Sequence, residues 1–245
     1  LIIGNNVYAH VPDINDFTKG LKAALNKDGI ITLEFPHLMR LIQHSQFDTV
    51  YHEHFSYLSL SVVKRIFNKF GLRVFDVEEL STHGGSLRIF GCHYSNQIIE
   101  SLRVQELIET EEKNGLSSIT TYDQFQIKAE KVKNALVSFL IEQKNLGKTV
   151  VAFGAAAKGN TILNYAGVRS DLLSYVCDSA PSKQGKFLPG SRIPILHPNV
   201  LKERKPNYIL ILPWNITDEI VDEYSYVKEW GAMFVTAVPE LRVIG

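Results

Sequence analysis

"VVAFGAAAKGN", residues 150–160, decides the fold of the second half of the chain. Its β-branched apolar run ends at Gly154 and a helical pattern begins around Gly159, so the segment predicts a strand, a tight turn and a helix. Further apolar runs follow at 172–178, 207–215 and 232–238, with a helical pattern over 217–231. Buried strands that alternate with helices predict a doubly wound parallel sheet.

The first half of the chain also alternates strands and helices. Strand-like apolar runs and amphipathic helical patterns follow one another at 1–7, 12–29, 30–35 and 60–71. The next two strand-like runs, 72–80 and 85–94, have no helix between them, which predicts an antiparallel pair at a sheet edge.

The domain organisation follows from these patterns. Residues 96–147 carry no strand signal and predict two charged amphipathic helices that bridge two domains. We therefore expect an α/β chain with a first domain over 1–95, a helical linker over 96–147 and a second, doubly wound domain over 148–245. Because Leu1 opens a strand-like run without a preceding methionine, we also expect the chain to be a fragment.

Composition limits the classes of partner. The 245 residues include 26 Lys and Arg and 26 Asp and Glu, so the formal net charge is zero and predicts binding neither to nucleic acid nor to an anionic membrane. No apolar stretch approaches the roughly 18 residues that span a bilayer. Cys92 and Cys177 lie far apart in apolar runs, which predicts buried free thiols in a reducing compartment. We expect a cytoplasmic protein that is a monomer or a weak homo-oligomer.

Polar side chains in the second half predict an anion-binding site. The small residues after Gly154 allow close approach of a ligand to the backbone, and the following helix start favours a phosphate. Acidic Asp178, 24 residues after Gly154, stands where ribose hydroxyls are commonly bound. The remaining candidates are Lys158, Gly159, Asn160, Lys183, Trp214 and Asn215, with Lys186 and Arg192 in the loop after Asp178. A tight strand–helix turn without any ligand remains the alternative interpretation.

In the first half, the stretch "FDTVYHEHFSY", residues 47–57, places His52 and His54 around Glu53. This stretch fits a metal site, an acid–base site or an ordinary polar segment. The two histidines would share a face and could bind one metal ion on a strand, but they would diverge on a helix, so the motif alone does not decide. It lacks the spacing of a zinc-protease helix. Further polar candidates follow strand ends or turns: Asn5, Asn6, His10, Tyr51 and His83. Taken together they suggest a pocket.

Five stretches, "NNVYAHVPD", "LEFPHL", "FDTVYHEHFSYLS", "VFDVEELSTHGGSLRIF" and "VVAFGAAAKGN", resemble those of the sugar C-methyltransferases in sequence and order. Members of this family use S-adenosylmethionine to methylate nucleotide-linked deoxyketosugars in deoxysugar biosynthesis. The resemblance implies the C-terminal part of a Rossmann-like methyltransferase sheet, then a second Rossmann-like domain. The family's preceding zinc domain and the glycine-rich donor loop are absent from this chain, so we expect zinc only in that missing domain and little activity from residues 1–245 alone.

The resemblance also assigns roles. It implies that His54 is the general base that forms an enolate next to the sugar ketone, with Glu53, Tyr51 and His10 in support and no metal required. Asn5 and Asn6 would contact the methyl donor. His83 and the glycine-turn residues of the second half would bind the sugar nucleotide, which in this family is usually a thymidine diphosphate sugar.

Two other functions stay open at this point. The pattern "GAAAKGN" followed by Asp178 also fits a nicotinamide cofactor site, which would make the protein an oxidoreductase. The third possibility is a non-catalytic module that binds sugar nucleotides. Zinc-spaced cysteines upstream of this sequence would favour the methyltransferase over both.

Overall fold

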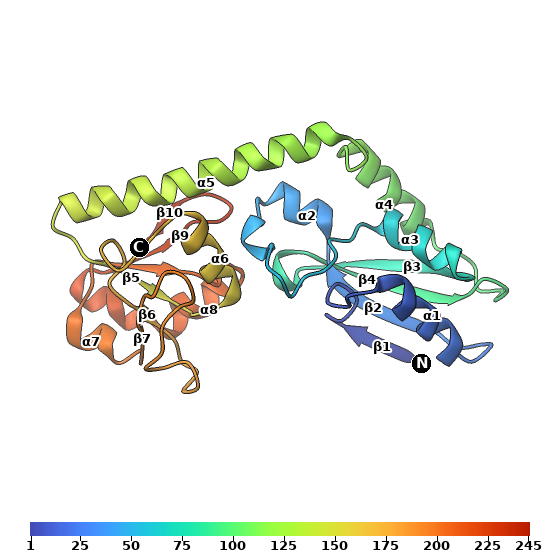
Figure 1. Ribbon diagram of the computed structural model, residues 1–245, viewed down its shortest axis with the longest axis horizontal. Coiled ribbons are helices and arrows are strands. Elements are labelled where there is room, and N and C mark those ends of the chain that lie inside the picture. Colours follow the sequence, from blue (N-terminus) through green and yellow to red (C-terminus); the bar gives the residue numbers. More distant parts are fainter. The chain divides into compact units, whose positions relative to one another are not determined.

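The computed structural model describes every residue from Leu1 to Gly245, and its contacts divide the chain into two units (Figure 1). Unit 1 comprises Leu1–His44 and His52–Phe125, and unit 2 comprises Ser45–Tyr51 and Gln126–Gly245. The helical stretch expected as a separate linker is therefore shared between the two units. The short segment Ser45–Tyr51 belongs to unit 2, although both of its chain neighbours belong to unit 1.

Unit 1 contains a mixed sheet of four strands in the order β1-β2-β4-β3. The strands are β1 (Ile2–Asn5), β2 (Ile31–Pro36), β3 (Leu72–Leu80) and β4 (Ser86–His93). β1 and β2 are parallel, whereas β4 is antiparallel to both β2 and β3. The predicted antiparallel pair at a sheet edge is confirmed, because β3 is an edge strand and pairs antiparallel with β4. A short turn, η2 (Thr82–Gly84), joins the two strands.

Three helices cover one face of this sheet, as Figure 1 shows. They are α1 (Ile14–Ala24), α3 (Leu60–Lys69) and α4 (Leu102–Lys113), and the six-residue α2 (Leu38–Gln43) follows β2. Asp13 caps α1 by accepting hydrogen bonds from the backbone N–H groups of Asn15 and Asp16, and Ser59 caps α3. The core between helices and sheet contains Leu21, Leu33, Phe35, Val63, Phe67, Ile89 and Val104.

Unit 2 contains a mixed sheet of six strands in the order β10-β9-β8-β5-β6-β7. The strands are β5 (Val150–Phe153), β6 (Val176–Cys177), β7 (Ile195–Leu196), β8 (Tyr208–Ile211), β9 (Met233–Thr236) and β10 (Arg242–Ile244). The five strands β5 to β9 are parallel, which confirms the predicted parallel sheet, and β10 is antiparallel to β9. After β7 the chain returns to place β8 on the other side of β5, so the winding direction changes between β5 and β8.

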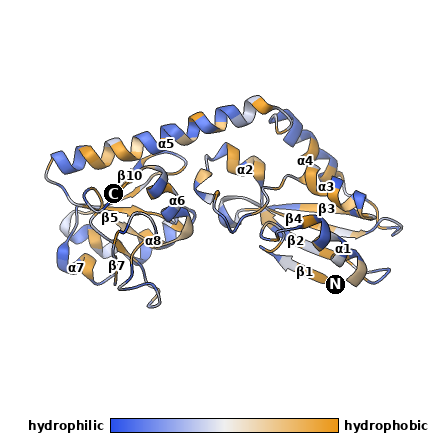
Figure 2. Ribbon diagram, in the orientation of Figure 1, coloured by the Kyte–Doolittle hydropathy of each residue, from blue (hydrophilic) through white to orange (hydrophobic).

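Helices lie on both faces of the second sheet. α7 (Val200–Arg204) and α8 (Thr217–Glu223) contribute Leu201 and Ile220 to the core on one face. On the other face lie α6 (Ala157–Tyr165) and most of α5 (Ile119–Asn145), whose Phe139 ring centroid is 5.2 Å from that of Tyr208. Apolar and polar residues alternate along the α5 ribbon in Figure 2, as expected for an amphipathic helix. Short 3-10 turns complete the unit at η1 (Phe47–Thr49), η3 (Trp214–Ile216) and η4 (Ser225–Trp230).

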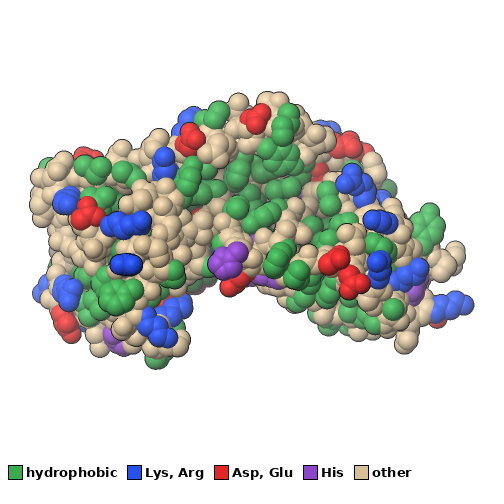
Figure 3. Space-filling model, in the orientation of Figure 1, with side chains coloured by type: hydrophobic (Ala, Val, Ile, Leu, Met, Phe, Trp, Pro, Cys, Tyr) green, Lys and Arg blue, Asp and Glu red, His purple; other side chains and the backbone are tan.

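Several predictions from composition can be compared with the structure. Cys92 and Cys177 are both buried and unbonded to each other, as predicted. None of the helices combines the length and the apolar character that a bilayer crossing requires. Acidic and basic side chains both occur over the face drawn in Figure 3, in keeping with the balanced charge.

Candidate functional site

The glycine turn of unit 2 lies at the point where the winding of its sheet reverses. Open α/β sheets bind ligands at this point, beyond the carboxyl ends of the two strands. Gly154 follows β5 with a φ of 88°, and a Cβ atom there would lie 2.4 Å from Cδ of Pro213. A Cβ at Gly159 would lie 2.6 Å from Cβ of Leu212. Both predicted glycines are therefore required for the turn and α6 to pack against the residues that follow β8.

The start of α6 is available to an anion. Its N-cap residue Ala156 has no side chain that could accept hydrogen bonds from the first-turn N–H groups. Such uncapped N–H groups, with the helix dipole, attract phosphate groups. Asn160 lies in the same first turns, and its Oδ1 is buried without a hydrogen-bond partner. The structure thus places the predicted glycine turn at a helix start that no side chain caps.

The structure brings three predicted residues of unit 2 together beside this helix end. Lys158 Nζ donates a hydrogen bond to Asn215 Oδ1 at 3.0 Å and lies 4.4 Å from the centroid of the Trp214 ring. Burial lowers the pKa of Lys158, and the nearby Asp48 carboxylate opposes that shift. The half-buried ammonium group is therefore held in one place, unlike an ordinary surface lysine.

Asp178, which directly follows β6, is hydrogen-bonded to the glycine turn. Its Oδ2 accepts hydrogen bonds from the Ala155 N–H at 2.7 Å and from Lys183 Nζ at 3.0 Å. Its Oδ1 accepts one from the Ala180 N–H at 2.8 Å. Both oxygens of this largely buried carboxylate are engaged by the chain itself, so its evident role is to orient the turn and Lys183. Lys186 and Arg192 are exposed.

Asp48 is a residue of this site that sequence reasoning missed. It lies in the Ser45–Tyr51 segment of unit 2, is fully buried, and its Oδ2 accepts a hydrogen bond from Trp214 Nε1 at 2.7 Å. Burial raises the pKa of Asp48 to about 6, against the opposing effects of Trp214 and Lys158. The only sequence signal was a carboxylate within the otherwise apolar start of "FDTVYHEHFSY".

In unit 1, the structure brings two predicted histidines together. The ring centroids of His10 and His54 are 4.7 Å apart with an interplanar angle of 72°, and the Tyr57 ring is 6.3 Å from that of His54. The backbone holds this pair, since the Ala9 carbonyl accepts hydrogen bonds from the N–H groups of Phe55 and Ser56 at 2.9 and 3.2 Å. Both imidazoles are half-buried.

The other members of the histidine motif are placed differently. His52 and Glu53 are exposed on a turn, and Tyr51 ends the Ser45–Tyr51 segment of unit 2. No group of three or more His, Cys, Asp or Glu side chains has an arrangement that could hold a metal ion. Within unit 1, therefore, the part of the motif that forms a defined cluster is His54 with His10.

A second polar group lies at the carboxyl end of β1. Asn6, with a φ of 53°, places its Nδ2 3.0 Å from Nε2 of His83, so these two predicted residues are also brought together. The exposed Asn5 is paired in register with Glu34 of β2. Sequence reasoning missed Glu34, a buried carboxylate that accepts hydrogen bonds from Thr82 and Arg88 at 3.0 Å each.

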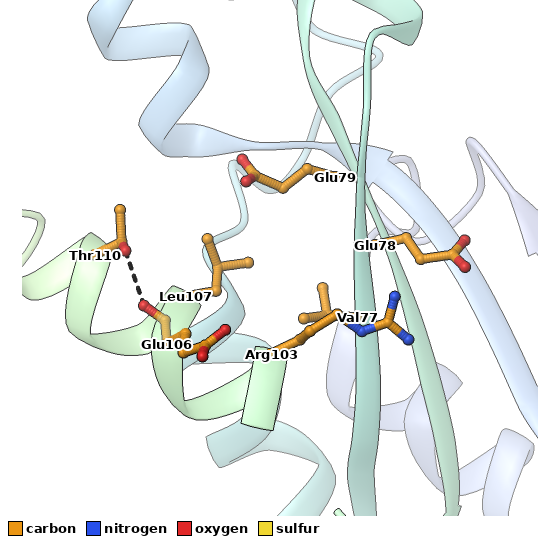
Figure 4. A pocket seen from close by; sticks show the side chains of 7 residues that line it. All are labelled: Val77, Glu78, Glu79, Arg103, Glu106, Leu107 and Thr110. Atoms are coloured by element: carbon orange, nitrogen blue, oxygen red, sulfur yellow. Dashed lines mark hydrogen bonds between the residues drawn. The ribbon is translucent and has the colours of Figure 1, made fainter. Parts of the chain in front are cut away.

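Unit 1 also has a surface hollow of about 420 Å³ between β3 and α4, shown in Figure 4. Most of its charged side chains are already paired: Glu79 with Arg40 at 2.8 Å, and Arg103 with Asp76. Glu78 points away from Glu79 in Figure 4 and pairs with Arg88 at 3.4 Å. Because these charges neutralise one another locally, the hollow is a weaker candidate than the histidine pair or the glycine turn.

Comparison with known proteins adds two findings. The sequence profile of the C-methyltransferase C-terminal domain matches residues 81–239. The chain is also 37% identical over 244 residues to the C-methyltransferase NovU of Streptomyces niveus. That similarity covers 100% of this chain and 58% of the relative, so the chain spans little more than half of the length of the curated protein it matches.

Proposed function

This chain belongs to the C-methyltransferase family, and we propose that it takes part in the transfer of a methyl group from S-adenosylmethionine to a carbon next to the ketone of a nucleotide-linked deoxysugar. The observation that carries the proposal is the His10–His54 pair, whose ring centroids are 4.7 Å apart. Carbon methylation needs a carbanion equivalent, and a proton must therefore leave the carbon that is methylated. An imidazole is suited to remove that proton, because histidine is the side chain that most often serves as a general base.

In this proposal His54 is the general base. Removal of the proton leaves an enolate, in which negative charge develops on the former ketone oxygen. His10, whose ring lies beside that of His54, would donate a hydrogen bond to that oxygen, and such donors stabilise the charge as it forms. Tyr51 and Glu53 of the same motif assist by hydrogen bonding to the substrate or to His54.

The methyl donor supplies an electrophilic methyl group on a sulfonium ion. Asn5 and Asn6 would provide polar contacts for it at the carboxyl edge of β1, where the Asn6 side chain is fixed by its 3.0 Å contact with His83, a residue expected to contact the sugar nucleotide. The amide groups of the two asparagines fit hydroxyl partners. The start of α1 does not fit the donor's carboxylate, because the carboxylate of Asp13 already accepts hydrogen bonds from the N–H groups there.

Unit 2 would hold the sugar nucleotide. The uncapped start of α6 and the fixed ammonium of Lys158 fit a diphosphate. Trp214, whose ring lies beside that ammonium, would also border the bound nucleotide. Gly154, Gly159 and Asn160 would form the backbone cradle, with Asn215 holding Lys158. Asp178 would act through Ala155 and Lys183 rather than by direct contact with the ribose. Since both Asp178 oxygens are engaged, no specific observation favours the nicotinamide alternative.

Calorimetric titration of this chain tests the division of ligands. We expect measurable binding of a thymidine diphosphate sugar and very weak binding of S-adenosylmethionine. Lys158→Ala should weaken nucleotide binding about tenfold or more, whereas Lys202→Ala, which removes an exposed lysine of α7 in the same unit, should change it little. Tight binding of NAD or of S-adenosylmethionine, without nucleotide binding, would contradict the assignment of unit 2.

A second experiment tests the reaction in the full-length protein. Incubation with a thymidine diphosphate ketosugar in deuterated water, without the methyl donor, should exchange the proton next to the ketone. NMR follows this exchange directly. His54→Ala should abolish it while nucleotide binding persists. Exchange that survives in His54→Ala but not in His10→Ala would transfer the role of base to His10.

A further inference from the structure

Asp48 is a buried ionisable group that the proposed function leaves without a role. Its side chain is fully buried, and one carboxylate oxygen accepts a hydrogen bond from Trp214 Nε1 at 2.7 Å. The other oxygen, Oδ1, has no hydrogen-bond partner. An unpartnered oxygen on a buried carboxylate costs free energy, so its retention at a ligand-binding edge calls for an explanation.

The surroundings of Asp48 are almost entirely apolar. It borders a cavity of about 10 Å³, roughly the space of one water molecule, lined by Leu136, Ile162, Leu210, Ile211, Leu212, Trp214, Ala237 and Val238. These residues come from α5, α6, β8, the chain that directly follows β8 and the chain after β9. The single opposite charge that acts on Asp48 is Lys158 of α6, whose ammonium lies over the Trp214 ring.

We propose that Asp48 is a positioning residue of the nucleotide site, which holds Trp214 and Lys158 in place and takes up a proton when a diphosphate binds beside Lys158. This inference rests on the proposed binding of a sugar nucleotide by unit 2. It adds that Asp48 takes up a proton from solution when the nucleotide binds. Asp48 acts through Trp214 and Lys158.

The direction of the proton movement follows from the charges. Without ligand, the pKa of Asp48 is raised to about 6 by burial, and Lys158 and Trp214 limit that rise. A diphosphate engages Lys158 and brings further negative charge, which raises the pKa of Asp48 again. Between the two values the free site is ionised and the bound site is protonated, so binding takes up a proton. Affinity then falls as pH rises above 6, by at most tenfold per pH unit for one proton.

Calorimetry on the 245-residue chain tests this linkage. The probe is thymidine diphosphate glucose, because its diphosphate has no terminal phosphate that titrates near pH 6. Titrations at pH 6.5 to 7, in two buffers that differ in ionisation enthalpy, give the number of protons taken up. We expect uptake of up to one proton in the native chain and loss of most of it in Asp48→Asn, which keeps an acceptor for Trp214. His197 is the only histidine of unit 2 and is common to both proteins, so the difference isolates Asp48.

A second measurement keeps Asp48 and therefore does not depend on the folding of Asp48→Asn. In Trp230→Phe, Trp214 is the only tryptophan of the chain, and its fluorescence should change with pH around a midpoint near 6 as Asp48 titrates. Equal proton uptake in native chain and Asp48→Asn, or a flat fluorescence profile, overturns the inference while the nucleotide site stands. Absence of any binding of thymidine diphosphate glucose by the native chain overturns both.

Discussion

Glu111 offers the sharpest test of what holds the histidine segment of unit 1. This buried carboxylate of α4 accepts hydrogen bonds from His37 Nε2 at 2.8 Å and from the backbone N–H groups of Leu60 and Ser61 at 2.6 and 3.0 Å. The last two donors open α3, six and seven residues after His54. Glu111→Ala should therefore loosen the start of α3 and the chain that leads into it.

The magnitude follows from the groups left behind. Each buried donor left without an acceptor costs about 1–3 kcal/mol, and Glu111→Ala removes the acceptor of three such donors. His37 Nδ1 already lacks a partner, so the variant would leave neither ring nitrogen bonded. We expect unit 1 to lose about 3–5 kcal/mol. Glu112→Ala, the exposed next residue on α4, is the matched control and should cost below about 0.5 kcal/mol.

The pH dependence has a definite sign. Burial alone would raise the pKa of Glu111, but the hydrogen bonds from His37, Ser61 and Leu60 outweigh burial and lower it. A carboxylate with a lowered pKa stabilises the fold above its unfolded value, near 4.5, and that contribution is lost as pH falls through the folded value. The difference in stability between the native chain and Glu111→Ala should therefore shrink below pH 4.5.

Hydrogen exchange measured by mass spectrometry is the assay, because it reports on the two units separately. Peptides from α3 and α4 should exchange faster in Glu111→Ala, by up to about a thousandfold for 4 kcal/mol. Both tryptophans, Trp214 and Trp230, lie in unit 2, so fluorescence-detected urea unfolding should hardly change. A loss below about 1 kcal/mol in unit 1, or a shift confined to the tryptophan transition, would refute the reasoning.

Three further predictions concern the candidate sites. His54→Ala in the full-length protein should lower turnover by about 10²- to 10⁴-fold, measured with a methyl-labelled donor, while the affinity for the sugar nucleotide changes little. Gly154→Ala should destabilise unit 2 by about 1–3 kcal/mol in fluorescence-detected unfolding, because its Cβ would lie 2.4 Å from Pro213; Gly185→Ala, also at positive φ but in open space, should cost less. Asp178→Ala should weaken binding of a thymidine diphosphate sugar severalfold in calorimetry by freeing the glycine turn and Lys183.

The fold was predictable where its signals are local. The run of Val150 to Phe153 and the glycines at 154 and 159 specify strand, turn and helix within eleven residues, and the structure has all three. β7 and β10 escaped prediction because they contain two and three residues and, unlike the two-residue β6, do not lie within a longer apolar run. Neighbouring strands, and not their own sequences, create them.

His10 and His54 could be chosen as candidates from local signals, whereas the buried carboxylates could not. His10 follows the β1 strand and its turn, and His54 lies in a distinctive motif, so both were candidates before any contact was known. Asp48 and Trp214 are 166 residues apart, and their hydrogen bond arises only from tertiary packing. Glu34 likewise acquires its significance from Arg88 across the sheet, 54 residues away.

The cost of Asp48 to unit 2 is itself an argument about function. Its pKa rises from 3.8 to about 6 on folding, so stability is lost as pH increases between these values, by about 3 kcal/mol at neutral pH since one pKa unit corresponds to about 1.4 kcal/mol. An asparagine would accept the same hydrogen bond from Trp214 without that cost. Asparagine, a residue of the same shape, would thus destabilise unit 2 less, and stability alone does not account for the carboxylate. Proton uptake linked to an anionic ligand requires an acid at this position, beside Lys158, and asparagine cannot supply it.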